Sequence, residues 1–209
     1  EAIPPALQGR DLWATAPTGS GKTLAFALPL VQQHVLQPRQ TNFRRPIRSL
    51  VLVPTRELAV QVGQVLQHAT DAMGLKLAVV HGGVSINPQM MALRGGADVV
   101  VATTGRLLDL VAHNALRLSD VQHLVLDEAD RLLELGFADE LQAVLALLPA
   151  PRQTLLFSAT FADDLSVWAH QGLRDPLRMR SDAIEVLDAP DIAQSAIAVD
   201  EKKRTALLR

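Results

Sequence analysis

The sequence predicts an α/β fold in which a parallel sheet is covered by helices on both faces. Short apolar runs rich in β-branched residues alternate with amphipathic helical patterns along most of the chain, which is typical of repeated βα units. The 209 residues, 48% of them hydrophobic, suffice for one large or two small globular domains. This composition excludes a disordered chain, a collagen and a small disulfide-rich scaffold.

Six apolar runs are predicted to be the strands, and two longer segments carry helical stripes. The runs are Leu12–Ala14, Leu50–Val53, Leu77–Val80, Val99–Ala102, Leu124–Leu126 and Thr154–Phe157. Apolar residues at steps of three and four define each stripe, and we interpret both stripes as faces that pack on the core. The first stripe contains Leu58, Val62, Val65, Leu66, Ala69 and Met73, and the second contains Leu141, Val144, Leu145 and Leu148.

The chain is predicted to contain one domain over residues 1–180 and a different segment over 181–209. Periodicity fades after Met179, and a short strand-like run at Ala196–Val199 is followed by a basic helix start at Glu201–Arg209. These last residues are too few to bury a core, so we expect a linker and the beginning of an absent second domain. The polar stretch at 37–46 is predicted to be a surface loop, and its arginines are more typical of a solvated loop than of an RNA contact.

Charge and residue counts restrict the classes of function. Twenty basic against 22 acidic residues give a formal charge of −2, so any nucleic-acid binding requires a local surface. The absence of cysteine excludes thiol nucleophiles and Cys-bound zinc, and it fits a cytoplasmic protein. The six histidines have no zinc-site spacing, and no apolar run reaches the roughly 18 residues of a membrane span. We therefore expect neither zinc nor a membrane as a partner.

A glycine-rich segment connects the first predicted strand to an apolar helix. Its residues are Ala16, Pro17, Thr18, Gly19, Ser20, Gly21, Lys22 and Thr23. This fits the phosphate-binding loop pattern, except that Ala16 stands where the pattern has glycine. Backbone N–H groups and the helix N-terminus would bind the phosphates of ATP, Lys22 would reach the β/γ-phosphates, and the Thr23 hydroxyl would hold Mg²⁺. The alternative is an ordinary glycine-rich turn.

Two carboxylates come directly after the fifth predicted strand. Asp127 and Glu128 would lie at the carboxyl edge of a parallel sheet, which is also the edge of the phosphate loop. We predict that Asp127 holds Mg²⁺ and that Glu128 is the general base for an attacking water. With Lys22 they form the predicted catalytic set. Taken alone, the acidic cluster would fit a helix N-terminus equally well.

The order of these and four further motifs resembles the DEAD-box ATP-dependent RNA helicases. The series is APTGSGKT (16–23), PTRELA (54–59), GG (82–83), TTGR (103–106), DEAD (127–130) and SAT (158–160). It is similar to the complete motif set of the first RecA-like domain of that family. The resemblance implies a RecA-like P-loop NTPase fold over residues 1–180. The segment 82–103 is similar to the bacterial RhlE-like subgroup.

The resemblance also implies that three segments hold the backbone of single-stranded RNA. The residues are Pro54, Thr55, Arg56, Gly82, Gly83, Thr104, Gly105 and Arg106. Backbone N–H groups and arginines bind phosphate without reading bases, so binding should be independent of sequence. Each segment alone would fit a strand-to-helix turn with a capping threonine. The family usually has proline where this chain has Thr104, whose hydroxyl could cap the helix instead, with slightly weaker RNA binding.

Ser158 and Thr160 resemble the family motif that bonds to the last aspartate of the DEAD sequence, here Asp130. The resemblance implies that this contact couples hydrolysis to closure of the two domains. A helix cap at Thr160 is an equally simple interpretation.

The resemblance further implies that functional segments of the family lie outside this chain. The residues that recognise adenine should precede Glu1, and a second RecA-like domain with an arginine finger should follow Arg209. Because such a finger contributes about 10³ to 10⁵ in rate, the piece should hydrolyse ATP poorly by itself.

Three alternatives remain at this stage. A DNA helicase or translocase shares the loop and the carboxylate pair, and RNA-specific stimulation would exclude it. An RNA-binding module without turnover is disfavoured by the intact Lys22, Thr23, Asp127 and Glu128. A P-loop kinase would not need the repeated turns that carry arginine and glycine.

Overall fold

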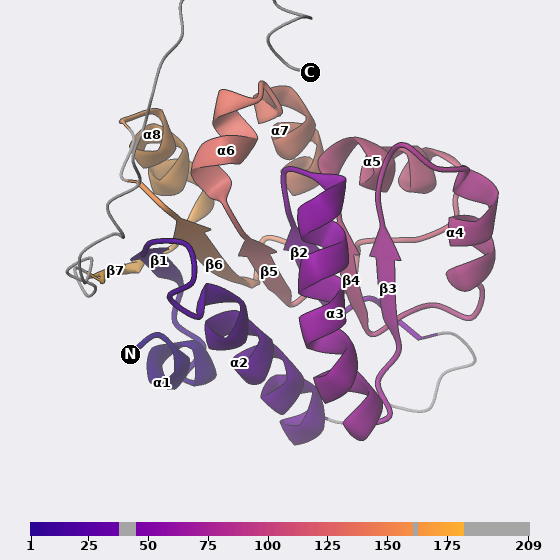
Figure 1. Ribbon diagram of the computed structural model, residues 1–209, viewed down its shortest axis with the longest axis horizontal. Coiled ribbons are helices and arrows are strands. Elements are labelled where there is room, and N and C mark those ends of the chain that lie inside the picture. Colours follow the sequence, from indigo (N-terminus) through magenta and orange to yellow (C-terminus); the bar gives the residue numbers. More distant parts are fainter. Residues whose placement is uncertain (38–44, 161–162, 182–209) are drawn as a thin grey trace, which may run out of the picture.

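Seven parallel strands form one sheet in the computed structural model, which describes residues 1–37, 45–160 and 163–181 (Figure 1). The strands are β1 (Leu12–Thr15), β2 (Ser49–Leu52), β3 (Leu77–Val80), β4 (Val99–Ala102), β5 (His123–Leu126), β6 (Gln153–Ser158) and β7 (Leu177–Arg180). Their order across the sheet is β3-β4-β2-β5-β6-β1-β7, and every neighbouring pair is parallel. The predicted parallel α/β class is confirmed.

Helices cover both faces of the sheet, as the sequence predicts (Figure 1). They are α1 (Ile3–Leu7), α2 (Lys22–Leu36), α3 (Arg56–Ala72), α4 (Ile86–Ala92), α5 (Thr104–Ala112), α6 (Ala129–Glu134), α7 (Ala138–Ala146) and α8 (Asp163–Gly172). Alternate strand residues point to opposite sides, so the sheet separates two apolar clusters. Val51 and Val53 pack with α1, α2 and α3, whereas Leu50 and Leu52 pack with α5 to α8.

The six predicted strands are all present, and the seventh is an addition. β7 pairs with β1 at the edge of the sheet, with Leu12 opposite Leu177. Its side chains alternate between half-buried and exposed positions, and two of them are arginines, so the segment lacks the apolar run that identifies a buried strand. The guanidinium of Arg178 lies 4.9 Å from the ring centroid of Trp13, which is a cation–π contact on β1.

The two helical stripes have different outcomes. The stripe on α7 is confirmed, because Leu141 and Val144 are buried in the core. On α3 the stripe is only partly right, since Val65 and Met73 are 37% and 53% exposed.

The face of α3 that packs on the sheet is Ala59, Val62, Gly63, Leu66 and Thr70. It includes a glycine because a Cβ at Gly63 would lie 2.5 Å from a Val79 methyl. Because α3 lies so close to β3, a glycine occupies this core-facing position in place of the larger apolar residue that periodicity favours.

Parts of the chain with sequence-based predictions lie outside the described residues. These are positions 38–44 of the predicted surface loop and all of the segment from 182 onward, including the strand-like run at Ala196–Val199. In the described part of the chain no helix is long and apolar enough to cross a membrane.

Candidate active site

The phosphate loop lies between β1 and α2, at the carboxyl edge of the sheet. The N–H of Ala16 donates to the Ser158 carbonyl at 3.1 Å, and the Lys22 ammonium donates to the Ala16 carbonyl at 2.7 Å. Gly21 caps α2 with φ of +86°, a left-handed conformation that glycine adopts without strain. Ala16 is not among the described residues with positive φ, so alanine fits where the general pattern has glycine.

Asp127 leaves β5 at the same edge and is 5% exposed. Its N–H donates to the Leu52 carbonyl at 3.0 Å, which continues the ladder between β5 and β2, and its Oδ1 accepts from the Glu128 N–H at 3.0 Å. Burial raises the pKa of Asp127 to about 6, opposed by the positive charge of Lys22 and reinforced by the carboxylates of Glu128 and Asp130. The predicted proximity of Lys22 and Asp127 is therefore present.

Glu128 adopts an unusual backbone conformation. Its φ and ψ of 51° and 49° place a non-glycine residue in the left-handed region, at the N-cap of α6. Such strain is typical of functional sites that the surrounding structure holds in place. The carboxylate accepts a hydrogen bond from the Arg131 guanidinium at 3.1 Å, and its side chain is 17% exposed. The sequence analysis missed Arg131, although its i,i+3 spacing from Glu128 on a helix is the signal that could have found it.

Asp130 connects the carboxylate motif to the end of β6. Its Oδ2 accepts hydrogen bonds from the N–H groups of Ala159 and Thr160 and from the Thr160 hydroxyl, each at 3.0 Å. The predicted contact with Asp130 is confirmed for Thr160. Ser158 does not make it.

The Ser158 side chain turns toward the phosphate loop. Its hydroxyl lies 3.2 Å from the Thr15 hydroxyl and donates to the Thr160 carbonyl at 2.8 Å. As the last residue of the β6 strand, Ser158 points inward where β6 pairs with β1, so it bonds across that pair instead of reaching α6.

The segment at 54–56 follows β2 and starts α3. Thr55 is the N-cap and accepts from the Leu58 N–H at 3.3 Å, so the structural interpretation of this threonine is correct. Arg56 is mostly exposed and forms an ion pair with Glu57. A Cβ at Gly83 would lie 3.1 Å from Arg56 Nη1, so two of the predicted RNA segments are in contact.

The segment at 103–106 starts α5 and is bonded to the turn at 82–85. Arg106 Nη2 donates to the Val84 carbonyl at 2.8 Å, and the Arg106 side chain is only 10% exposed. Its guanidinium is thus directed to a neighbouring loop and not into solvent, and its contact with RNA stays a prediction.

Thr104 occupies the first helical position of α5, where the family has proline. The N-cap is Thr103, which makes no side-chain capping bond. The turn therefore forms as expected, but not through the capping hydroxyl that we predicted for Thr104. Thr104 is buried, and the first bond within the helix runs from the Leu107 N–H to the Thr103 carbonyl at 3.0 Å.

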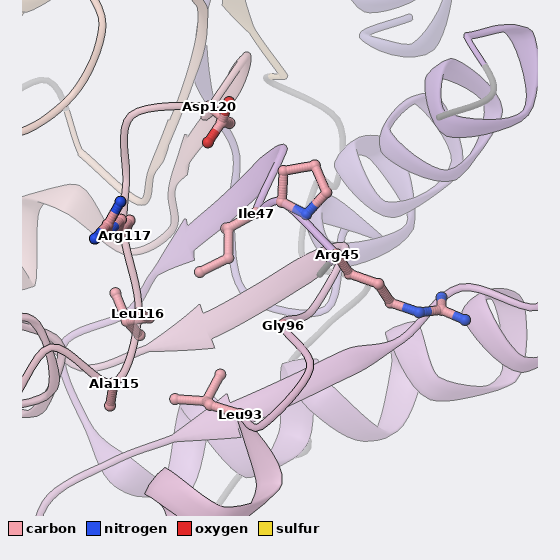
Figure 2. Close-up of a pocket in the computed structure, with 9 residues that line it drawn as sticks. Arg45, Ile47, Leu93, Gly96, Ala115, Leu116, Arg117 and Asp120 are labelled. Carbon is pink, nitrogen blue, oxygen red and sulfur yellow. The ribbon is translucent and has the colours of Figure 1, made fainter. Parts of the chain in front are cut away.

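Two cavities, among others in the described residues, lie at opposite edges of the sheet. One, of about 190 Å³, borders the phosphate loop and is lined by Ala14, Ala16, Lys22, Phe157 and Met179 among others. The other, of about 330 Å³, lies where β2 and β4 begin (Figure 2). The cavity where β2 and β4 begin is remote from Asp127 and Glu128, whereas the smaller one adjoins the phosphate loop. A further cavity, of about 370 Å³, lies between that loop and Ala159 and Thr160. Over residues 1–37, 45–160 and 163–181 no group of three His, Asp or Glu side chains is placed to hold a metal by itself.

Comparison with known proteins agrees with this geometry. The chain matches the family described as DEAD/DEAH box helicase over residues 1–166. It is 47% identical over 175 residues to the DEAD-box ATP-dependent RNA helicase 3B, chloroplastic, of Zea mays, covering 83% of this chain and 23% of the maize protein. It is 39% identical over 208 residues to the DEAD-box ATP-dependent RNA helicase CshA of Bacillus cereus, covering 100% of this chain and 38% of that protein.

A solved structure supports the same assignment. The crystal structure of a hypothetical ATP-dependent RNA helicase from Sulfolobus tokodaii matches with a TM-score of 0.76 at 35% identity, covering 87% of this chain and 51% of that one. The chain thus spans only part of the length of its relatives, and the RhlE-like assignment stays a prediction. The RecA-like α/β fold is confirmed, and the chain belongs to the DEAD/DEAH box helicase family.

Proposed function

We propose that the protein containing this chain is an ATP-dependent RNA helicase and that this chain binds ATP with Mg²⁺ and the backbone of single-stranded RNA. The observation that supports this is the arrangement at one edge of one sheet. The phosphate loop, the two carboxylates and three turns bearing glycine or arginine all follow parallel strands there, and hydrogen bonds connect neighbouring members of the set.

The residues at Asp127 fit a magnesium ion. One carboxylate oxygen accepts a single hydrogen bond, from the Glu128 N–H, and the described residues donate no other bond to this carboxylate. A buried carboxylate whose pKa is raised gains stability from a nearby cation, and Mg²⁺ prefers such oxygen ligands. Asp127 and the Thr23 hydroxyl would hold the ion. When bound, it neutralises charge on the phosphates.

The side chains around this position have separate roles. Lys22 exchanges its bond to the Ala16 carbonyl for the β/γ-phosphates. Glu128 orients the attacking water and accepts its proton, and the Arg131 ion pair holds the carboxylate in place beforehand. Asp130, bound to Thr160, transmits the state of this site to the end of β6, with Ser158 joining β6 to the loop.

RNA would bind across the three turns without sequence preference. Arg56 is exposed and adjacent to Gly83, so a phosphate can meet a charge and turn N–H groups together. The second RecA-like domain would supply the arginine finger, and closure of the two domains would separate a short duplex. We further propose a cytoplasmic location.

ATP hydrolysis by the full-length protein tests this function. It is measured without nucleic acid, with single-stranded RNA and with single-stranded DNA. We expect stimulation by RNA alone, and a decrease of about 10² to 10⁴ in the Glu128→Gln variant, because a general base contributes that much. Lys22→Ala should also abolish turnover.

Two matched variants control for nonspecific effects. Glu134→Gln changes an exposed carboxylate on the same helix, and Lys76→Ala removes an ammonium that bonds to the Arg94 carbonyl away from the site. Both should retain full activity. Equal stimulation by DNA, or turnover indifferent to nucleic acid, would contradict the RNA assignment.

A further inference from the structure

Gln89, on α4, forms a two-way hydrogen-bond pair with the backbone of His81. Its Nε2 donates to the His81 carbonyl and its Oε1 accepts from the His81 N–H, both at 3.1 Å. The same Nε2 lies 3.5 Å from the Ser85 carbonyl. The side chain is 9% exposed, so this amide is a buried link between α4 and the two ends of the turn that carries Gly82 and Gly83.

Side chains occupy most carbonyl oxygens of this turn. Gln89 bonds those of His81 and Ser85, the His81 ring Nδ1 lies 2.9 Å from the Gly82 carbonyl, and Arg106 donates to that of Val84. Among the described residues, by contrast, none accepts a hydrogen bond from the N–H of Gly82, Gly83 or Val84. Most carbonyl groups of the turn are therefore hydrogen-bonded within the protein, whereas its N–H groups at 82–84 can donate to a ligand.

The helix behind the turn packs on the core. Ile86 and Met90, on either side of Gln89, pack against the apolar cluster beneath α5. Ser85, the N-cap of α4, makes no side-chain capping bond, so a cap does not fix the entry to the helix. Gly83 has φ of +78°, which glycine adopts without strain, and its neighbour on that side is the exposed Arg56 side chain, which does not fix the turn. The Gln89 amide is thus the contact that fixes the start of the turn relative to α4.

We propose that Gln89 is a positioning residue for RNA binding, because it holds the turn at 81–85 so that the Gly82 and Gly83 N–H groups face a phosphate. Gln89 itself does not touch RNA. The inference rests on the proposed function and deepens it, since it names a buried residue outside the motif series as a determinant of RNA affinity.

Gln89→Met and Gln89→Glu in the full-length protein test the inference. Methionine preserves length but removes both bonds to His81, whereas glutamate preserves an acceptor for the His81 N–H and loses the donor. Gln142→Met, at an exposed position on α7, is the matched control. Three quantities are measured: the RNA concentration for half-maximal ATPase stimulation, the KM for ATP, and hydrogen exchange of a peptide that covers the turn.

We expect the half-maximal RNA concentration of Gln89→Met to rise about tenfold, because a mispositioned donor loses most of a charge-assisted hydrogen bond. The KM for ATP should stay within about twofold, since the phosphate loop is on another strand. Exchange should accelerate at the His81 amide, whose N–H bonds to Gln89, but not in α5. Gln89→Glu should show a rise at least as large, because a buried carboxylate oxygen would face the His81 and Ser85 carbonyls, and Gln142→Met should show none. A merely structural role would instead lower kcat with the folded fraction and leave the half-maximal RNA concentration unchanged.

The remaining outcomes overturn the proposal in distinguishable ways. Faster exchange with unchanged RNA dependence means that Gln89 holds the turn but RNA does not need it. Unchanged exchange and RNA dependence in both variants mean that the turn is fixed without Gln89. If the wild-type protein itself fails to respond to RNA, the proposed function falls first, and the inference falls with it.

Discussion

The two edges of the sheet bury polar side chains for different purposes. At the carboxyl edge Asp127 is 5% exposed and accepts one hydrogen bond from its neighbour, so part of its carboxylate is left for a ligand. At the amino edge Asp98 is 1% exposed, and its Oδ2 accepts from the Lys76 N–H at 2.8 Å and pairs with Arg45. The burial of the Asp127 carboxylate is compensated only in part, by one N–H and the charge of Lys22, whereas Asp98 also pairs with an arginine in direct contact.

Two buried histidines, His34 and His123, also lie at the amino edge. His34 Nε2 lies 2.9 Å from the Ser49 hydroxyl, where β2 begins. Burial, reinforced by the charge of Arg48, lowers the pKa of His34 to about 4, and burial likewise lowers the pKa of His123. Changes at the carboxyl edge should therefore alter chemistry, and changes at the amino edge should alter stability.

The sharpest test of this contrast is Asp127→Asn. In the full-length protein we expect RNA-stimulated hydrolysis to fall by about 10³, since the Mg²⁺ proposed at Asp127 would supply several kcal/mol of charge stabilisation. In this chain with EDTA at pH 7, the same change should raise the free energy of unfolding by about 2 kcal/mol, because it removes a buried charge whose pKa is raised.

Urea unfolding followed by the fluorescence of the buried Trp13 and Trp168 measures the stability half of that prediction. Asp139→Asn, at an exposed position on α7, is the control and should change neither quantity. A loss of stability in Asp127→Asn would show that this carboxylate is compensated as fully as Asp98.

At the opposite edge Asp98→Ala should lower the stability of the fold and leave catalysis unchanged. Removing it leaves the Lys76 N–H and the Arg45 guanidinium without this partner, so we expect a loss of about 3 kcal/mol in the free energy of unfolding. The kcat of the folded full-length protein should not change. Asp120→Ala, an exposed carboxylate at the same edge, should alter stability by less than about 0.5 kcal/mol.

The lowered pKa of His34 predicts how the free energy of unfolding depends on pH. The unfolded chain protonates His34 below pH 6.5, whereas the folded chain does so only near pH 4. Stability is therefore full above pH 6.5 and falls by about 2 to 3 kcal/mol as the pH drops toward 4, because the unfolded state binds more protons. The charged or titratable neighbours that set this are Arg48, Asp98 and His123.

His34→Gln isolates this effect, because its amide can still bond the Ser49 hydroxyl. Urea unfolding at pH 5 and at pH 7 should differ less in the variant than in the wild type. An unchanged difference between the two pH values would assign the slope to His123 or to other groups.

The smallest expected effect on stability is that of Arg56→Ala. Its ion pair with Glu57 is solvent-exposed, so its loss should leave the free energy of unfolding nearly unchanged. RNA binding by the full-length protein should nevertheless weaken equally for unrelated sequences, and the slope of log K against log salt should decrease by about 0.7 for one lost phosphate contact. Sequence-dependent weakening would indicate base recognition instead.

Most of the fold, and the proposed nucleotide site, can be predicted from local sequence patterns. Buried parallel strands are short apolar runs, which the sequence shows directly. The loop at 16–23 and the carboxylates at 127–128 are particular residues at fixed spacing, so a sequence pattern identifies them as well. The sequence did not predict β7, because an edge strand that packs on one side only lacks the continuous apolar run of a buried strand.

Tertiary structure decided which side chains pair across the sheet. The sequence placed Ser158 and Thr160 together beside Asp130, but the pairing of β6 with β1 directs the Ser158 hydroxyl to Thr15. Of the two hydroxyls, the one that bonds Asp130 is therefore that of Thr160. Likewise, no local pattern distinguishes Gln89 from any other helical glutamine, since its partners lie on the turn that precedes the helix. Residue types and spacing determine the chemistry that a chain can perform, but hydrogen bonds between distant segments depend on directions that only the packed sheet fixes.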